Sequence, residues 1–172
     1  MFRKNMGTVV SFISQNTGRT DDPDPVTGLT TRDKYLVKTS WAKLAKTPTD
    51  SGVALLLLFF KKFPQYVELF PFKDTPYDEL KTSKKFRAHC TSVVYGLSAI
   101  IDAINDNDLL IQLLHKTGSS HKLRSVTQQG FEDLKAVTIE LFSSIMKPDE
   151  VAAWKKTLEV AFSQIYVGIK EN

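Results

Sequence analysis

The sequence has few of the residues on which disulfide-stapled and membrane-spanning proteins depend. It contains one cysteine, Cys90, among 172 residues, and a lone cysteine cannot form an intramolecular disulfide bond. Its densest apolar stretch, Val53 to Phe60, is eight residues long, whereas a membrane-spanning helix needs roughly 20. No N-terminal apolar run has the length of a secretory signal. We therefore expect a soluble protein of the reducing cytosol.

Several common sequence motifs are also missing. Phosphate-loop, dinucleotide-binding and EF-hand patterns are absent, and no segment alternates apolar and polar residues with the period of a strand. The net charge is +4, but pairs of lysines are scattered along the chain at 61–62, 84–85 and 155–156. Because they form no single basic block, we expect no nucleic-acid partner. What remains is one all-α domain with a single sizeable core.

Apolar residues recur every three or four positions from Thr30 onward, which predicts a series of helices. Thr30 and Asp33 are suited to cap the first helix, which carries Trp41, and a second helix is expected after Thr47. Short connections between the elements indicate an all-α bundle of seven or eight helices. The later elements are expected as a helical turn from Pro64, a corner at 70–76, and helices at about 83–105, 108–117 (ended by Gly118), 126–146 and 148–169.

Residues 1–28 differ in composition from the rest of the chain. Polar residues, Gly and Pro dominate from Ser14 onward, and such a segment does not propagate a helix. We expect a flexible N-terminal extension followed by one domain at 29–172. If translation starts at Met6 and not at Met1, Gly7 stands in an N-myristoylation pattern. One such acyl chain gives only reversible membrane attachment, so membrane association through Gly7 is an alternative to a purely cytoplasmic protein.

The three histidines, His89, His115 and His121, are the candidate metal ligands. A neutral imidazole that a helix turns toward an apolar pocket can bind the iron of a flat hydrophobic cofactor such as haem. His89 has Phe86 and Val93 one turn away on either side. A zinc site is disfavoured because no two histidines stand four residues apart and no carboxylate cluster completes a ligand set. Helix position alone would favour ordinary histidines without a ligand.

Cys90 is not expected to act as a nucleophile or a metal ligand. It lies about 100° round the helix from His89, so the two side chains do not easily share a metal. No glycine-rich turn or other device for stabilising an oxyanion accompanies it. We interpret Cys90 as a small core or surface residue.

Several runs together resemble the globin family, from about Leu29 to Ile169. They are Phe59-Phe60-Lys61-Lys62-Phe63-Pro64, Leu69-Phe70-Pro71-Phe72 and Phe86-Arg87-Ala88-His89, with Trp41 in the first helix. The chain is most similar to intracellular arthropod globins and has neuroglobin- and cytoglobin-like features. The resemblance implies the globin fold, seven to eight helices around one haem b.

The resemblance also implies a role for each candidate site residue. The interval of 32 residues from His89 to His121 is similar to that of neuroglobin-like chains, which makes His121 the proximal iron ligand and His89 the distal histidine. His115 is then a partly exposed helical residue. Thr117 departs from the leucine that is common at its position, which puts the proximal packing in question. Of the other residues expected to line the haem, Phe70 stacks on the ring, and Val93 and Leu56 lie on its distal side. The remaining ones are Phe86, the proximal and corner residues Val126 and Phe131, and Leu134 one turn further along the helix.

By this resemblance the expected function is reversible O2 binding for storage or facilitated diffusion, with CO and NO as further ligands. His89 either donates a hydrogen bond to the gas or binds the iron directly in the unliganded state, and spacing leaves both open. The alternatives are nitric oxide dioxygenation or nitrite reduction with an external reductase, and oxygen or redox signalling at a membrane. Apart from such minor activities we expect no enzyme, and a homodimer is an alternative to a monomer.

Overall fold

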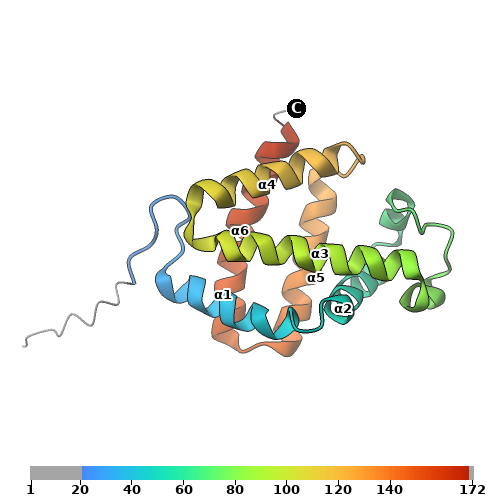
Figure 1. The fold of residues 1–172 in the computed structure, drawn as a ribbon, viewed down its shortest axis with the longest axis horizontal. Helices are drawn as coiled ribbons and strands as arrows, with labels where there is room; N and C mark the ends of the chain where they lie inside the picture. Colours follow the sequence, from blue (N-terminus) through green and yellow to red (C-terminus); the bar gives the residue numbers. More distant parts are fainter. Residues whose placement is uncertain (1–20, 171–172) are drawn as a thin grey trace, which may run out of the picture.

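The computed structural model describes residues 21–170, and these residues form helices and connecting turns without a strand (Figure 1). The predicted all-α architecture is confirmed. None of the helices in this part of the chain is both long and apolar enough to cross a bilayer. The elements are α1 (Thr31–Leu44), α2 (Pro48–Lys62), η1 (Pro64–Leu69), η2 (Tyr77–Thr82), α3 (Lys84–Asp102), η3 (Ala103–Asn105), α4 (Asn107–Lys122), α5 (Gln128–Ile145) and α6 (Pro148–Lys170).

Helix starts follow the capping residues of the sequence. Thr30 and Asp33 form a reciprocal capping box at the start of α1, as predicted. Ser83 caps α3 through the Phe86 amide, and Thr127 caps α5 through the Gly130 amide. These side chains satisfy backbone amides that have no partner within the helix, so short polar residues fix where each helix begins.

The predicted end of the fourth α-helix at Gly118 is wrong. α4 continues through Gly118 to Lys122. A Cβ built on Gly118 would overlap the carbonyl oxygen of Ile165, which lies on α6. The glycine therefore serves the close crossing of α4 and α6, and it does not terminate the helix. As a result, His121 lies in the last turn of α4 and not in a loop.

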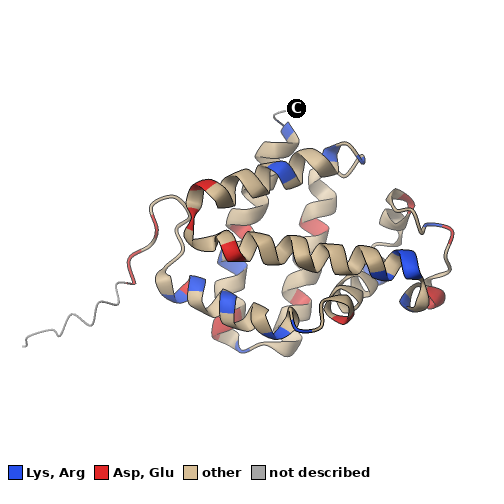
Figure 2. Ribbon diagram, viewed as in Figure 1, with Lys and Arg blue, Asp and Glu red and all other residues tan. Residues whose placement is uncertain are grey.

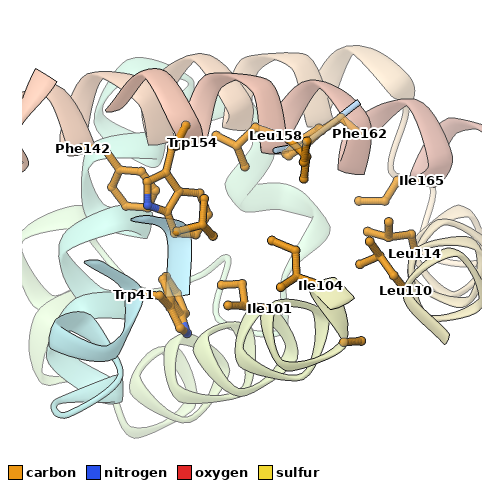
Figure 3. Close-up of a cluster of buried hydrophobic side chains, with 14 of the residues drawn as sticks. Trp41, Ile101, Ile104, Leu110, Leu114, Phe142, Trp154, Leu158, Phe162 and Ile165 are labelled. Atoms are coloured by element: carbon orange, nitrogen blue, oxygen red, sulfur yellow. The ribbon is translucent and has the colours of Figure 1, made fainter. Parts of the chain in front are cut away.

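The helices pack in crossed pairs around two apolar clusters. α4 packs mainly on α6 and α2 on α3, while α5 and α6 run behind α3 and across its direction (Figure 1). In the first cluster, the rings of Trp41 and Trp154 lie 5.8 Å apart, and Phe142 lies beside Trp154 (Figure 3). The cluster continues to Leu110, Leu114 and Ile165 at its other end. Trp154 Nε1 donates to Ser40 Oγ at 2.8 Å, which satisfies a buried donor. The second cluster joins α2, the corner and α3 through Phe59, Phe60, Phe72, Phe86 and their neighbours.

The segment before α1 is bound to the helical body. Asp24 accepts hydrogen bonds from the Val26 and Thr27 amides, and its carboxylate pairs with Lys34 Nζ at 2.9 Å. Asn107 Nδ2, at the start of α4, also donates to it at 3.1 Å. Asp24 to Gly28 thus form a fixed turn, although composition placed them in the extension. The Met6–Ser11 acylation pattern lies outside the described residues.

Candidate functional site

Two helices bring His89 and His121 toward one another. His89 lies in the first half of α3 and His121 in the last turn of α4. Burial lowers the pKa of both imidazoles, and the pKa of His89 is lowered further by the charge that His121 would carry. The effect of the His121 charge on the pKa of His89 indicates that the two imidazoles are near one another. Both are therefore neutral at pH 7, which is the state in which an imidazole binds a metal.

The ring of His121 is oriented by its own helix. Its Nδ1 lies 2.8 Å from the Thr117 carbonyl oxygen, one turn earlier, and 3.4 Å from Ser120 Oγ. A carbonyl oxygen only accepts, so Nδ1 carries the proton and Nε2 keeps its lone pair. The edge of the Phe131 ring, 5.2 Å away, packs against the imidazole. A histidine held by a backbone acceptor at one nitrogen is prepared to ligate a metal with the other.

His89 is held by aromatic contacts instead. Its ring lies 5.0 Å from that of Phe70 in an edge-on arrangement, and 6.0 Å from that of Phe72. Among the described residues, no hydrogen bond fixes either of its ring nitrogens. The half-buried imidazole is thus able either to ligate a metal or to donate a hydrogen bond to a small ligand.

Glycines set the positions of the two helices that carry the histidines. A Cβ on Gly52 of α2 would overlap the carbonyl oxygen of Cys90, the residue after His89. A Cβ on Gly168 of α6 would overlap the carbonyl oxygen of His115 on α4. Both glycines are buried, so their role is to let two helix backbones touch. The sequence analysis missed both, because a helical glycine does not show which helix it will meet.

The other predicted site residues belong to the two apolar clusters or pack against them. Phe70, Val93 and Leu134 are half-buried at the edge of the second cluster, while Leu56 and Phe86 lie deeper in it. On the other side, Phe131 is buried in the first cluster and Val126 packs against it. The half-buried members can line a pocket, and Leu56 and Phe86 support it from behind.

The structure shows the contacts of His115, the third histidine, and of Thr117, the departure from leucine. His115 lies half-buried on α4 with its Nε2 3.0 Å from Gln164 Oε1 on α6. The imidazole of His115 therefore contributes to the packing of α4 on α6. Thr117 contributes its backbone carbonyl to His121, and any residue can supply that acceptor. The departure from leucine at this position therefore leaves the orientation of His121 intact.

Positive charge borders the site. Arg124 lies just beyond α4, and its charge lowers the pKa of both His89 and His121. Figure 2 shows further basic residues at the amino end of α3, where Lys84, Lys85 and Arg87 stand. In the described part of the chain, no group of three His, Cys, Asp or Glu side chains could hold a metal ion. Two neutral imidazoles, apolar walls and a cationic rim fit an iron porphyrin, which is flat, apolar and carries two carboxylates.

Comparison with known proteins identifies a family and several similar chains. The family model described as Globin matches residues 53–165. A globin of Nerita albicilla is 33% identical over 144 residues, covering 80% of this chain and 90% of that protein. Globin CTT-V of Chironomus thummi piger is 34% identical over 142 residues, covering 78% and 84%. The structure of the hexa-coordinate hemoglobin of Drosophila melanogaster is similar with a TM-score of 0.77 and 29% identity, covering 80% of this chain and 94% of that one.

Proposed function

The chain belongs to the globin family, and from that premise we propose that it holds haem b between His121 and His89 and binds O2 reversibly. The observation that carries the proposal is the orientation of His121. Its Nδ1 proton is engaged by the Thr117 carbonyl, which leaves Nε2 free to ligate iron. The haem iron, when bound, supplies the coordination position for a diatomic gas.

The residues of this chain would perform three tasks. His121 anchors the iron from one side, and its carbonyl partner raises the basicity of the ligand. Phe70, Val93 and Leu134 exclude water from the ring. Arg124 offers a cation to the porphyrin carboxylates.

His89 has two uses that compete. Because its pKa is lowered, it is neutral at pH 7 and keeps one N–H, which can donate a hydrogen bond to a polar diatomic ligand. It can equally ligate the iron in the absence of gas, since no hydrogen bond in the described structure holds its nitrogens elsewhere. The similarity to a hexa-coordinate hemoglobin favours this second use at rest. The apparent gas affinity is then reduced by the fraction of molecules in which His89 has left the iron.

The visible spectrum of the reduced, deoxygenated protein tests the role of His89. Sharp, split α and β bands are expected for the wild type, because both axial positions are filled. His89→Gln should give one broad band and a higher apparent O2 affinity. A single broad band in the wild type would contradict ligation by His89 while leaving O2 binding in place.

A pair of histidine variants on the same helix tests the proximal ligand. His121→Gly should lose stable haem retention, and added imidazole should restore it by occupying the vacated position. His115→Gly is the matched control, because it removes a half-buried imidazole of α4 that bonds to Gln164. If His115→Gly releases the haem and His121→Gly retains it, the assignment of the proximal ligand is wrong.

A further inference from the structure

Ser125 differs from the other serines in the described part of the chain. Each of the others forms a hydrogen bond through its hydroxyl group, in most cases with a carbonyl oxygen of its own helix. The Ser125 hydroxyl forms none with a described residue, and Ser125 is exposed. Its hydroxyl is therefore accessible to an enzyme that approaches from the solvent.

The residues just before Ser125 are basic. Lys122 stands three positions before it and Arg124 directly before it, and all residues from 122 to 125 are exposed. Leu123, between the two cations, is 86% exposed. Figure 2 shows basic residues at this end of α4. Protein kinases choose their substrates partly by the pattern of charge around the acceptor hydroxyl, so this segment suits a kinase that selects basic residues.

A second hydroxyl residue has similar neighbours but is out of reach. Thr157 follows Lys155 and Lys156, yet it is only 9% exposed. Its hydroxyl donates to the Ala153 carbonyl oxygen at 2.9 Å within α6. Basic neighbours alone therefore do not make a substrate, and the exposed, unbonded hydroxyl distinguishes Ser125 from Thr157.

The backbone at Ser125 favours opening of the segment. Residues 123–127 connect α4 to α5 and lie outside both helices (Figure 1). Ser125 has a φ of 62°, a left-handed conformation that is unfavourable for a residue with a Cβ. The turn is closed by the Ser125 amide, 2.9 Å from the Lys122 carbonyl oxygen, and by the Val126 amide, 3.2 Å from that of His121. Because the turn is strained, less free energy is needed to extend it in the groove of a kinase.

A phosphate on Ser125 would stand next to the cation that borders the histidine site. Arg124 Nη1 donates to the Ser120 carbonyl oxygen at 2.6 Å, over the last turn of α4. Its charge lowers the pKa of both His89 and His121, so it acts on both sides of the site. A phosphate carries a charge of about −1.5 to −2 and binds a guanidinium more strongly than a neutral carbonyl does. It would compete for Arg124 and offset its charge.

We propose that Ser125 is a phosphorylation site for a serine kinase that selects basic residues, and that the phosphate weakens haem retention by drawing Arg124 away from the porphyrin carboxylates. The effect on haem rests on the proposed function. The kinase transfers the γ-phosphoryl group of ATP to Ser125 Oγ. The bond from the γ phosphorus to the bridging oxygen breaks, ADP leaves, and the hydroxyl proton passes to the catalytic base of the kinase.

The modification is tested by treating the haem protein with ATP and, in turn, cyclic-AMP-dependent kinase and protein kinase C. Intact mass and peptide mapping should show a phosphate on the peptide that contains Ser125. Ser125→Gly should lose this phosphate, and glycine also fits the positive φ, so the turn keeps its shape. The peptide that contains Thr157 is the matched control and should stay unmodified, because its hydroxyl is buried.

A pair of variants of equal shape tests the effect on haem. Ser125→Asp and Ser125→Asn both tolerate a left-handed backbone, but only the aspartate carries a charge. Ser125→Asp and the phosphorylated protein should release haem to an excess of a haem-accepting protein about two- to fivefold faster than Ser125→Asn, the effect of losing one exposed ion pair. In an Arg124→Gln background the two substitutions should differ little, because the cation on which the charge acts is gone.

The two parts of the proposal fail separately. If neither kinase modifies Ser125, the phosphorylation site is wrong and the proposed haem binding still stands. Equal haem release from Ser125→Asp and Ser125→Asn, or an undiminished difference in the Arg124→Gln background, overturns the role of Arg124. A protein that shows no haem absorption before treatment contradicts the proposed function and the effect on haem, whereas peptide mapping still decides whether Ser125 is modified.

Discussion

At the scale of single residues, the protonation of His89 and His121 makes the stability of the fold depend on pH. Burial lowers the pKa of His89 and His121 below the ordinary value of 6.5. The folded protein therefore binds fewer protons than the unfolded chain once the pH falls below the unfolded pKa. The free energy of unfolding that these residues contribute is fully present above that value and declines as the pH falls.

The predicted consequence is a loss of stability in mild acid for protein prepared without haem. Between about pH 7.5 and about pH 5.5 the free energy of unfolding in urea should fall, by at most about 1.4 kcal/mol per pH unit for each imidazole. His89→Gln should make this dependence shallower, because it removes one of the two groups. An equally steep dependence in His89→Gln would contradict the assignment of a lowered pKa to His89.

The histidine pair shows how far single residues can be interpreted from sequence. Their number and spacing singled out His89 and His121, since only three histidines had to be weighed. The acceptor that orients His121 could not be foreseen in the same way. It is the backbone carbonyl of Thr117, and it is in reach only because α4 continues past Gly118. Because the sequence pattern ended the helix at Gly118, it could not predict the hydrogen bond from His121 to Thr117.

Close crossings of helix pairs position the site at the scale of elements. Capping residues predicted where α1 began, because capping is a local interaction between Thr30 and Asp33. Gly52 and Gly118 act between elements, at the contacts of α2 with α3 and of α4 with α6. Glycine is a weak helix former in any sequence, so its use at a crossing becomes visible only when the partner helix is known.

Two alanine variants test whether close approach is the role of Gly52. Gly52→Ala should lower the free energy of unfolding by about 1–3 kcal/mol, because the new methyl group overlaps the Cys90 carbonyl. Gly96→Ala, on exposed α3 surface with nothing within 4 Å of the new methyl group, should raise it by about 0.5–1 kcal/mol. Urea unfolding of both variants supplies the measurement. Equal stabilisation in both would show that α2 and α3 can separate at no cost.

At the scale of the whole molecule, the two apolar clusters have different roles. One packs the helices together, and the other carries most of the predicted site residues. The first contains the Trp41–Trp154 contact and joins α1 with α3 to α6 around side chains that pack on one another (Figure 3). Most predicted site residues lie instead in the second cluster or against it, as Phe70 does at the corner before η2. The first cluster therefore depends less on a cofactor, because only Phe131 and Val126 of the predicted site residues belong to it or pack against it. The half-buried walls of the second cluster have apolar surface left for one.

This division predicts where the protein loosens when haem is removed. Saturation with haem at about 100 times its dissociation constant should stabilise the fold by about 2.7 kcal/mol, so the haem-free protein should unfold at a lower temperature. Amide hydrogen exchange should show the largest loss of protection at residues 63–82 and in the last turn of α4, which carries His121. The segments around Trp41 and Trp154 should stay protected, because their packing involves no site residue. Reconstitution with haem should restore the protection of both regions. A uniform loss over all helices would instead mean that the two clusters fold as one cooperative unit, with the haem stabilising α1 and α6 as strongly as the walls of its own pocket.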